Sequence, residues 1–116
     1  MSDTTLLHIA QRSDLVAANA NGHYRAASLD SEGFLHCCHP TQLSGVVQRW
    51  FDGVDDLVLL TINSDTLPAP LVHENTTGGE ELFPHVYGEI PLSSIIAQHD
   101  FGLNSVRRQQ VTGDKP

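Results

Sequence analysis

The segment Asp56-Leu57-Val58-Leu59-Leu60-Thr61-Ile62 decides the fold, because its apolar and β-branched residues follow one another almost without a polar break. A short run of this kind, lacking the alternation of a half-exposed strand, predicts a central β-strand. Turn-forming residues at Asn63-Ser64-Asp65 end it. The sequence therefore predicts a sheet built around residues 56–62.

The residues after this strand predict further β-structure. They give a strand at Leu71-Val72-His73-Glu74, a polar loop over residues 75–81, an extended segment Phe83-Pro84-His85-Val86-Tyr87-Gly88 leading into Ile90, one helical turn from Leu92, and a last strand near residues 95–101.

A helix is expected directly before the central strand. Pro40-Thr41 opens it and Gly53 ends it. The apolar residues recur at helical spacing and form one stripe: Leu43, Val46, Val47, Trp50 and Phe51. Burial of each would contribute about 1.5–3 kcal/mol, so we expect this helix to anchor the core. Trp50 and Phe51, together with Phe34, are assigned to the core.

The N-terminal third predicts a strand, a helix and a second strand. The first strand covers residues 5–9, and the helix after it is capped by Ser13-Asp14 and stopped by Gly22. Residues 24–29 show no clear period, and Asp30-Ser31-Glu32-Gly33 is typical of a turn. Phe34-Leu35-His36-Cys37-Cys38 is compatible with a buried strand. Together these elements predict one α+β domain over residues 1–103, with a disordered polar tail at residues 104–116.

Composition narrows the functional classes. The chain of 116 residues has six Lys and Arg against fourteen Asp and Glu, and a formal net charge of −8. Such a surface repels nucleic-acid backbones and anionic membranes. No apolar run is long enough to span a bilayer and no signal peptide opens the chain, so we expect a cytoplasmic protein. The partner expected is a small-molecule ligand; the oligomeric state stays open.

No metal site is expected, although His36-Cys37-Cys38-His39 first suggests zinc. Consecutive strand residues point to opposite faces, whereas zinc ligands usually come in pairs two to four residues apart. The adjacent Cys37 and Cys38 are expected to be reduced thiols, and nothing nearby in the sequence lowers a cysteine pKa.

Seven histidines are unusual in so short a chain, and His8 and His36 are the first two candidates among them. His8 ends the first strand and could hold a ligand hydroxyl or carbonyl, or it could be a half-exposed strand residue without a role. His36 follows Gly33 and two large apolar residues, so a buried imidazole that needs polar partners is expected. A core histidine bonded to a backbone carbonyl is the alternative.

A second group of candidates lies near the Phe83-Pro84-His85-Val86-Tyr87-Gly88 segment. His85 and Tyr87 would point to one face of an extended chain and suit a planar ligand, or they would form an aromatic lid over the core edge. Glu74 could orient ribose hydroxyls or stabilise a cationic transition state, or it could be a solvated strand end. Tyr24, Arg25 and Ser28 complete the ligand-binding candidates, with Arg25 as the base for a phosphate.

Taken in order, these segments resemble the family catalogued as domain of unknown function 952 over roughly residues 6–100. The residues that carry the resemblance are Leu7-His8-Ile9, Ala18, Gly22, Tyr24, Ser28-Leu29, residues 32–37, Gln42, Phe51, residues 56–60, Ile62, Leu67, Glu74 and residues 82–88. The chain departs from the pattern at Leu15, where the family often has Trp, and at Glu89, where Pro is common.

The resemblance implies a fold like that of the ADP-ribosyltransferases, with two small, split antiparallel sheets and helices around a cleft. That class includes the transferase that moves an RNA 2′-phosphate onto NAD. By this similarity His8 and His36 would line an NAD-type pocket, completed by Tyr24, Glu74, His85 or Tyr87. The implied activity is that of an NAD-dependent or degenerate transferase, with His8, His36, His85 and Glu74 as catalytic candidates. The alternative is a non-catalytic module that binds a small molecule or a peptide.

Overall fold

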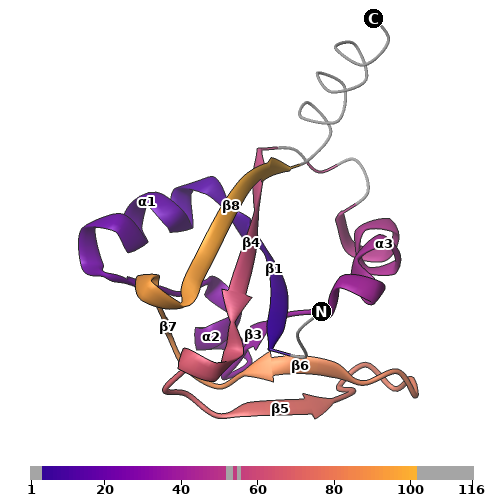
Figure 1. Cartoon of the computed structure of the whole chain (residues 1–116). Coiled ribbons are helices and arrows are strands. Elements are labelled where there is room, and N and C mark those ends of the chain that lie inside the picture. Colours follow the sequence, from indigo (N-terminus) through magenta and orange to yellow (C-terminus); the bar gives the residue numbers. More distant parts are fainter. Residues whose placement is uncertain (1–3, 52–53, 55, 102–116) are drawn as a thin grey trace, which may run out of the picture.

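Strand β4 (Leu57–Asn63) lies in the middle of a three-stranded antiparallel sheet, between β1 (Thr5–Gln11) and β8 (Ile95–Phe101). The central strand predicted at residues 56–62 is therefore confirmed. His8 pairs with Leu60 and Leu59 pairs with His99 in this sheet. The computed structural model describes residues 4–51, 54 and 56–101 (Figure 1). Gly53 and the predicted tail at residues 104–116 lie outside the described residues.

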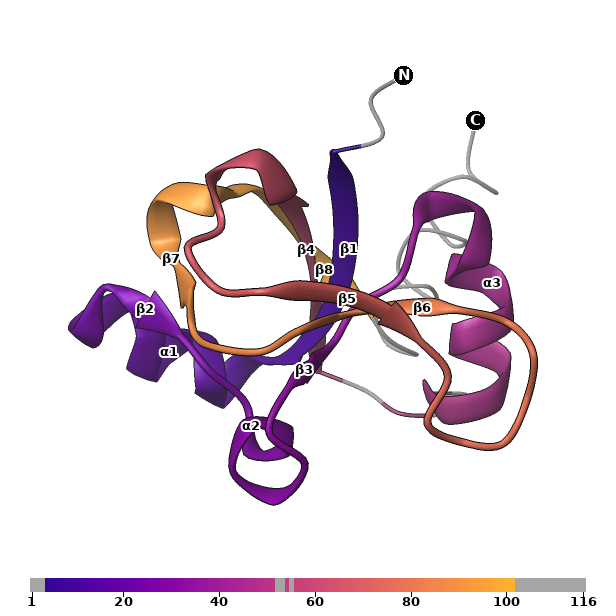
Figure 2. The same cartoon turned by 90° about the horizontal axis from the view of Figure 1, so that it is seen from below.

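A second three-stranded antiparallel sheet has the order β3-β6-β5. Its strands are β3 (Leu35–His36), β5 (Leu71–Glu74) and β6 (Phe83–Val86). Figure 2 shows β5 and β6 running across the end of the first sheet. A backbone bridge between Leu7 and Cys38 connects the two sheets, so β1 and the β3 segment are held side by side. The expected α+β fold with antiparallel sheets is confirmed.

The remaining elements are short. They are α1 (Arg12–Asn21), β2 (His23–Tyr24), α2 (Ala27–Ser31), η1 (Pro40–Gln42), α3 (Leu43–Val46), the π-helical turn η2 (Val47–Phe51), η3 (Ser64–Thr66), β7 (Ile90–Pro91) and η4 (Leu92–Ser94). Strands β2 and β7 pair as a two-stranded ribbon. Both β2 and α2 overlap the stretch of residues 24–29 where the sequence showed no period, and α2 continues into the predicted turn at residues 30–33. No helix among the described residues is long and apolar enough to cross a bilayer.

Helix α1 differs from the prediction at its start. It begins at Arg12 directly after β1, with Gln11 as its N-cap and no side-chain cap, so the predicted cap at Ser13-Asp14 is wrong. The chain turns from strand to helix before Ser13, which places both residues inside the first turn. The predicted stop is confirmed, because Gly22 adopts a left-handed φ of 85° and its N–H donates to the Ala18 carbonyl.

The core lies between the first sheet, α1 and the second sheet. Alternation along β1 and β4 directs Leu6, Ala10, Val58, Leu60 and Ile62 to one face. There they pack with the other buried residues of the cluster: Leu15, Ala18, Tyr24, Leu35, Cys37, Val86 and Ile90. Phe34 is buried as predicted.

The helix at residues 40–51 does not anchor the core, contrary to the prediction. It is divided into η1, α3 and η2, and none of the five stripe residues is buried; Trp50 is 57% exposed and Phe51 is half-buried. The core face of the first sheet is already covered by α1, and α3 lies on the other side of that sheet (Figure 1). Three residues of the stripe, Val46, Trp50 and Phe51, line a pocket instead.

Candidate functional site

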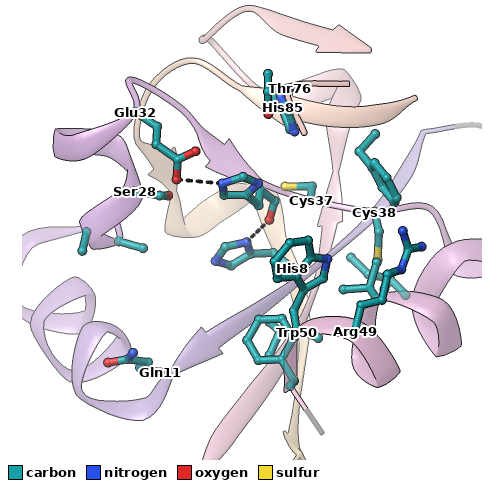
Figure 3. A pocket seen from close by; sticks show the side chains of 18 of the residues that line it. His8, Gln11, Ser28, Glu32, Cys37, Cys38, Arg49, Trp50, Thr76 and His85 are labelled. Carbon is teal, nitrogen blue, oxygen red and sulfur yellow. Dashed lines mark hydrogen bonds and ion pairs between the residues drawn. The ribbon is translucent and has the colours of Figure 1, made fainter. Parts of the chain in front are cut away.

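A pocket of about 610 Å³ lies between the two sheets and the helical segment of residues 43–51. Its apolar wall includes Leu7, Ile9, Val46, Trp50, Phe51 and Phe83. Its polar lining includes Gln11, Asp14, Tyr24, Ser28, Glu32, His36, Arg49, Thr76, Thr77, His8 and His85. Figure 3 shows the labelled side chains converging from the strands and the helix. A mixed pocket of this volume is of the size that binds small molecules.

His8 is 5% exposed rather than half-exposed, and both of its ring nitrogens are engaged. Nδ1 lies 2.5 Å from the backbone carbonyl oxygen of His36, so Nδ1 carries the hydrogen, since a carbonyl only accepts. Nε2 then accepts from the Tyr24 hydroxyl at 2.7 Å. Burial lowers the pKa of His8 to about 4 and raises the pKa of Tyr24. In this arrangement the neutral His8 ties β1 to β2 and β3, and its ring has no nitrogen left for a ligand.

His36 is exposed, not buried as predicted, because β3 is only two residues long and alternation turns Leu35 inward and His36 outward. Its Nε2 lies 3.0 Å from a carboxylate oxygen of Glu32, just beyond α2, and its side chain is 47% exposed. The ring also meets Phe34 edge-on, at 4.8 Å between centroids. His36 thus presents a carboxylate–imidazole pair to the pocket.

His85 is 3% exposed and lines the same pocket from β6. Its Nδ1 lies 2.9 Å from Glu74 Oε2, and its ring stacks on Phe34 with centroids 4.1 Å apart and planes 13° apart. The His36 ring lies 5.1 Å away, edge-on. The pocket therefore holds two imidazoles, each bonded to its own carboxylate.

Glu74 and Tyr87 lie behind His85 and do not line the pocket. The Tyr87 hydroxyl donates to the same Glu74 oxygen that His85 contacts. The Tyr87 hydroxyl, followed by the His85 imidazole, holds the pKa of Glu74 below its usual value. Glu74 in turn raises the pKa of Tyr87. His85 and Tyr87, two residues apart in the sequence, therefore both bond to the Glu74 carboxylate.

Arg25 is not at the pocket, contrary to the expectation that it serves a phosphate there. Its guanidinium bonds to Asp30 and Glu89 on the surface. Ser28 does line the pocket, but its hydroxyl donates to the Phe34 carbonyl at 2.8 Å. The basic side chain among the described lining residues is Arg49, on the helix that sequence reasoning assigned to the core.

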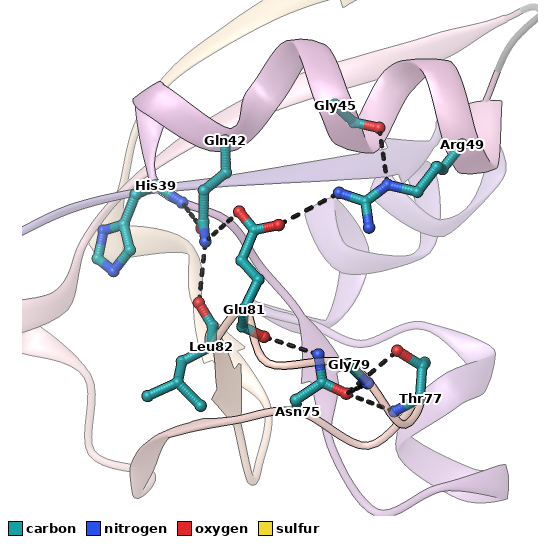
Figure 4. Close-up of polar contacts among 9 residues, drawn as sticks. All are labelled: His39, Gln42, Gly45, Arg49, Asn75, Thr77, Gly79, Glu81 and Leu82. Carbon is teal, nitrogen blue, oxygen red and sulfur yellow. Dashed lines mark hydrogen bonds and ion pairs between the residues drawn. The ribbon is translucent and has the colours of Figure 1, made fainter.

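Arg49 and its neighbours fasten a loop to the helix (Figure 4). Arg49 Nη2 lies 3.3 Å from Glu81, and Gln42 Nε2 donates to Glu81 and to the Leu82 carbonyl. Within the loop, the Asn75 side chain accepts from the Thr77 and Gly79 amides and donates to the Glu81 carbonyl. These bonds hold Thr76 and Thr77 at the edge of the pocket.

Several lining residues were missed from the sequence, chiefly Glu32, Arg49 and Trp50. Glu32 was assigned to a turn, and its carboxylate reaches His36 because the two residues are four apart across that turn. Trp50 belongs to a stripe whose helical spacing fits burial and pocket lining equally well, and Arg49 is its neighbour in the chain. An Arg next to a Trp on a short helix could have indicated a ligand-facing surface, because both side chains are common in binding sites.

Cys37 and Cys38 are both buried free thiols. Burial raises the pKa of Cys38 to about 11, and it raises the pKa of Cys37 as well. Both are therefore protonated at neutral pH and unsuited to nucleophilic attack. Among the described residues, no group of three or more His, Cys, Asp and Glu side chains is arranged to hold a metal ion.

Comparisons with known proteins give a family and a solved fold. Residues 9–98 match the family model described as "Protein of unknown function (DUF952)". The crystal structure of protein CC0527 from Caulobacter crescentus is 31% identical, with a TM-score of 0.76 over 86% of this chain and 88% of that one. Its solution structure gives a TM-score of 0.72 at 31% identity, over 86% of each chain. No curated protein matches the chain.

Proposed function

This chain belongs to the DUF952 family, and we propose that its pocket binds the nicotinamide–ribose end of NAD or a related ADP-ribose nucleotide. The observation that carries the proposal is the lining of one pocket by an exposed indole, Trp50, and by a carboxylate–imidazole pair, Glu32 and His36. The antiparallel α+β architecture is compatible with the ADP-ribosyltransferase-like fold that the sequence resemblance implies, and a site in the cytoplasm would meet such nucleotides.

The aromatic wall suits a flat, positively charged ring. Trp50 offers a π-face for stacking, and a cationic pyridinium gains further attraction from an indole face. The Phe83 ring beside it lies under the Arg49 guanidinium, 5.8 Å from the ring centroid. Asp14 and Glu32 add negative charge to the lining. The aromatic and acidic part of the lining therefore supports an oxidised nicotinamide ring as the group bound there.

The polar lining suits the ribose and one phosphate. The Glu32 carboxylate and the Nδ1 atom of His36 can accept hydrogen bonds from ribose hydroxyls. Arg49 is bonded to Glu81 by an exposed ion pair at 3.3 Å, which is a weak interaction in water. A ligand phosphate can replace the Glu81 carboxylate at little cost.

The second candidate function is a non-catalytic module for a small metabolite or a peptide. The observation that favours it is the internal bonding of His8, Tyr24 and Ser28, whose polar atoms are already satisfied by the protein. Because these polar atoms are already bonded, such a pocket would select its ligand by shape and would not catalyse a reaction. A binding module of this kind should bind a different aromatic ligand, and its Trp50 fluorescence should not respond to NAD.

The test uses Trp50 as its own reporter, because the chain has a single tryptophan. Tryptophan fluorescence of the full chain is titrated with NAD and with ADP-ribose, with free tryptophan as the absorption blank. We expect saturable quenching by NAD. His36→Ala should weaken binding by at least about tenfold through lost hydrogen bonds.

Val16→Ala is the matched control, since Val16 is an exposed apolar residue of α1 that does not line the pocket. It should leave the affinity unchanged. Fluorescence that does not respond to either nucleotide at millimolar concentration, together with no heat in calorimetry, would refute the proposed function.

A further inference from the structure

His85 is held in the pocket with one ring nitrogen fixed and the other open. Glu74 Oε2 engages Nδ1 at 2.9 Å, and the Phe34 ring stacks on the imidazole. Nε2 of His85 has no hydrogen-bond partner among the described residues. Every solvent-inaccessible side-chain nitrogen or oxygen of the described residues does have one, so Nε2 is accessible. Because His85 lines the pocket and is otherwise buried, we infer that Nε2 is open to the pocket.

We propose that His85 is a general base positioned by Glu74, and that the protein is an enzyme that hydrolyses the nicotinamide–ribose bond of the bound nucleotide. This inference rests on the proposed function, because it names the reaction that would follow binding. Binding alone would not require a general base in the pocket, whereas hydrolysis does.

The hydrogen-bond network fixes the tautomer that a base requires. A carboxylate accepts only, so Nδ1 of His85 carries the hydrogen and Nε2 carries the lone pair. The Tyr87 hydroxyl donates to the same carboxylate oxygen and holds it in place. Stacking on Phe34 keeps the imidazole from rotating. This is the arrangement in which a carboxylate orients an imidazole for proton transfer.

The other candidate bases in the pocket are less suited. Both ring nitrogens of His8 are bonded within the protein, and the thiol of Cys38 has a raised pKa. His36 is exposed and bonded to Glu32, which fits contact with ribose hydroxyls. His85 alone among these four combines burial, a carboxylate partner and a free nitrogen.

The step balances with water as the co-reactant. A water oxygen forms a bond to C1′ of the nicotinamide ribose while the bond from C1′ to the pyridinium nitrogen breaks. The electron pair of the broken bond goes to that nitrogen, so nicotinamide leaves as a neutral molecule. The proton of the water passes to Nε2 of His85 and then to solvent. The products are ADP-ribose, nicotinamide and one proton.

The test measures nicotinamide released from NAD by the full chain, by chromatography, in parallel with the Trp50 fluorescence titration. His85→Asn should lower kcat by about a hundredfold or more, the usual contribution of a general base. Glu74→Gln should lower kcat by about tenfold while KM stays the same, because Glu74 positions the base and does not touch the nucleotide. A merely structural role for Glu74 would change thermal stability and leave kcat intact.

His73→Asn is the matched control: His73 is an exposed histidine of the neighbouring strand β5 that does not line the pocket. It should release nicotinamide at the wild-type rate. Equal thermal midpoints and equal NAD quenching would show that His85→Asn is folded and binds.

Two results would overturn the inference and leave the proposed function standing. One is saturable quenching of Trp50 by NAD without nicotinamide release by the wild-type chain. The other is release that His85→Asn does not reduce. If NAD does not bind at all, the proposed function fails and the hydrolysis inferred from it fails with it.

Discussion

Strand β4 and the helical segment of residues 43–51 are both rich in large apolar residues, yet they are buried to different extents. In β4, Leu57, Val58, Leu60 and Ile62 are all buried. In the helical segment no residue is buried, and Trp50 is more than half exposed. Apolar content alone therefore does not tell core from ligand-facing surface; the difference is whether another element covers the residues.

The same contrast holds for the two buried histidines. His8 bonds to a backbone carbonyl and a hydroxyl, and both of its nitrogens are engaged. His85 bonds to one carboxylate and keeps a nitrogen open. The first histidine connects three strands, whereas the second is available for chemistry. A buried imidazole is structural when the protein bonds both of its nitrogens, and it is available for chemistry when one nitrogen stays unbonded.

The largest expected effect separates β4 from the helical segment by stability. Leu60→Ala should lower the free energy of unfolding by about 2–5 kcal/mol, because Leu60 is fully buried in the core cluster. Trp50→Ala should lower it by less than about 1 kcal/mol, because the indole is largely solvated. Urea unfolding followed by circular dichroism measures both. Equal losses would show that the helix is part of the core after all.

A second prediction uses the depressed pKa of His8 to mark it as structural. Its pKa falls from 6.5 to about 4 on folding, so the unfolded chain binds more protons between these values and stability declines as the pH falls. From about pH 7.5 to about pH 5, His8 should account for roughly 2 kcal/mol of lost stability.

The comparison variant for this prediction is His8→Gln, which removes the titrating ring. Its overall stability will be lower at every pH, but its loss between the two pH values should be smaller than that of the wild type. An identical loss in both proteins would contradict the assignment of His8 as a buried neutral histidine.

The smallest expected effect concerns the contact between the loop and the helical segment. Glu81→Gln removes the exposed ion pair with Arg49 and should cost at most about 1 kcal/mol of global stability. Amide hydrogen exchange of Thr76 and Thr77 should nevertheless become faster, because Glu81 ties their loop to Gln42 and Arg49. Unchanged exchange would mean that Asn75 alone orders the loop.

Much of the fold was predictable because strand and turn signals are local. The run at residues 56–62 predicted β4, and the stop at Gly22 followed from glycine's access to left-handed backbone. The strand at Leu71-Val72-His73-Glu74 and the polar loop after it were also predicted. By contrast, β2 and α2 are too short to show a period. Strand β2 forms where long-range pairing with β7 holds it, and α2 packs against the neighbouring β3.

The candidate site was predicted only in part. The sequence singled out His8, His36, Tyr24, Ser28 and His85, which line one pocket in the structure. It could not find Glu32 or Arg49, because which charged side chains face a pocket depends on how surface elements lie against one another. It also assigned Arg25 to a phosphate, whereas two nearby carboxylates hold that side chain on the surface.

The sequence by itself determined the α+β character, the central strand and the histidines near the ends of short strands, because these follow from local periodicity and residue type. Only the tertiary structure decided which histidine has both ring nitrogens bonded and which keeps one unbonded, because the partners lie far away in the chain. For His8 the partners are Tyr24 and the His36 carbonyl, and for His85 the partner is Glu74. The tertiary structure likewise decided that Val46, Trp50 and Phe51 of the apolar stripe line a pocket, because α1 covers the core side of the sheet.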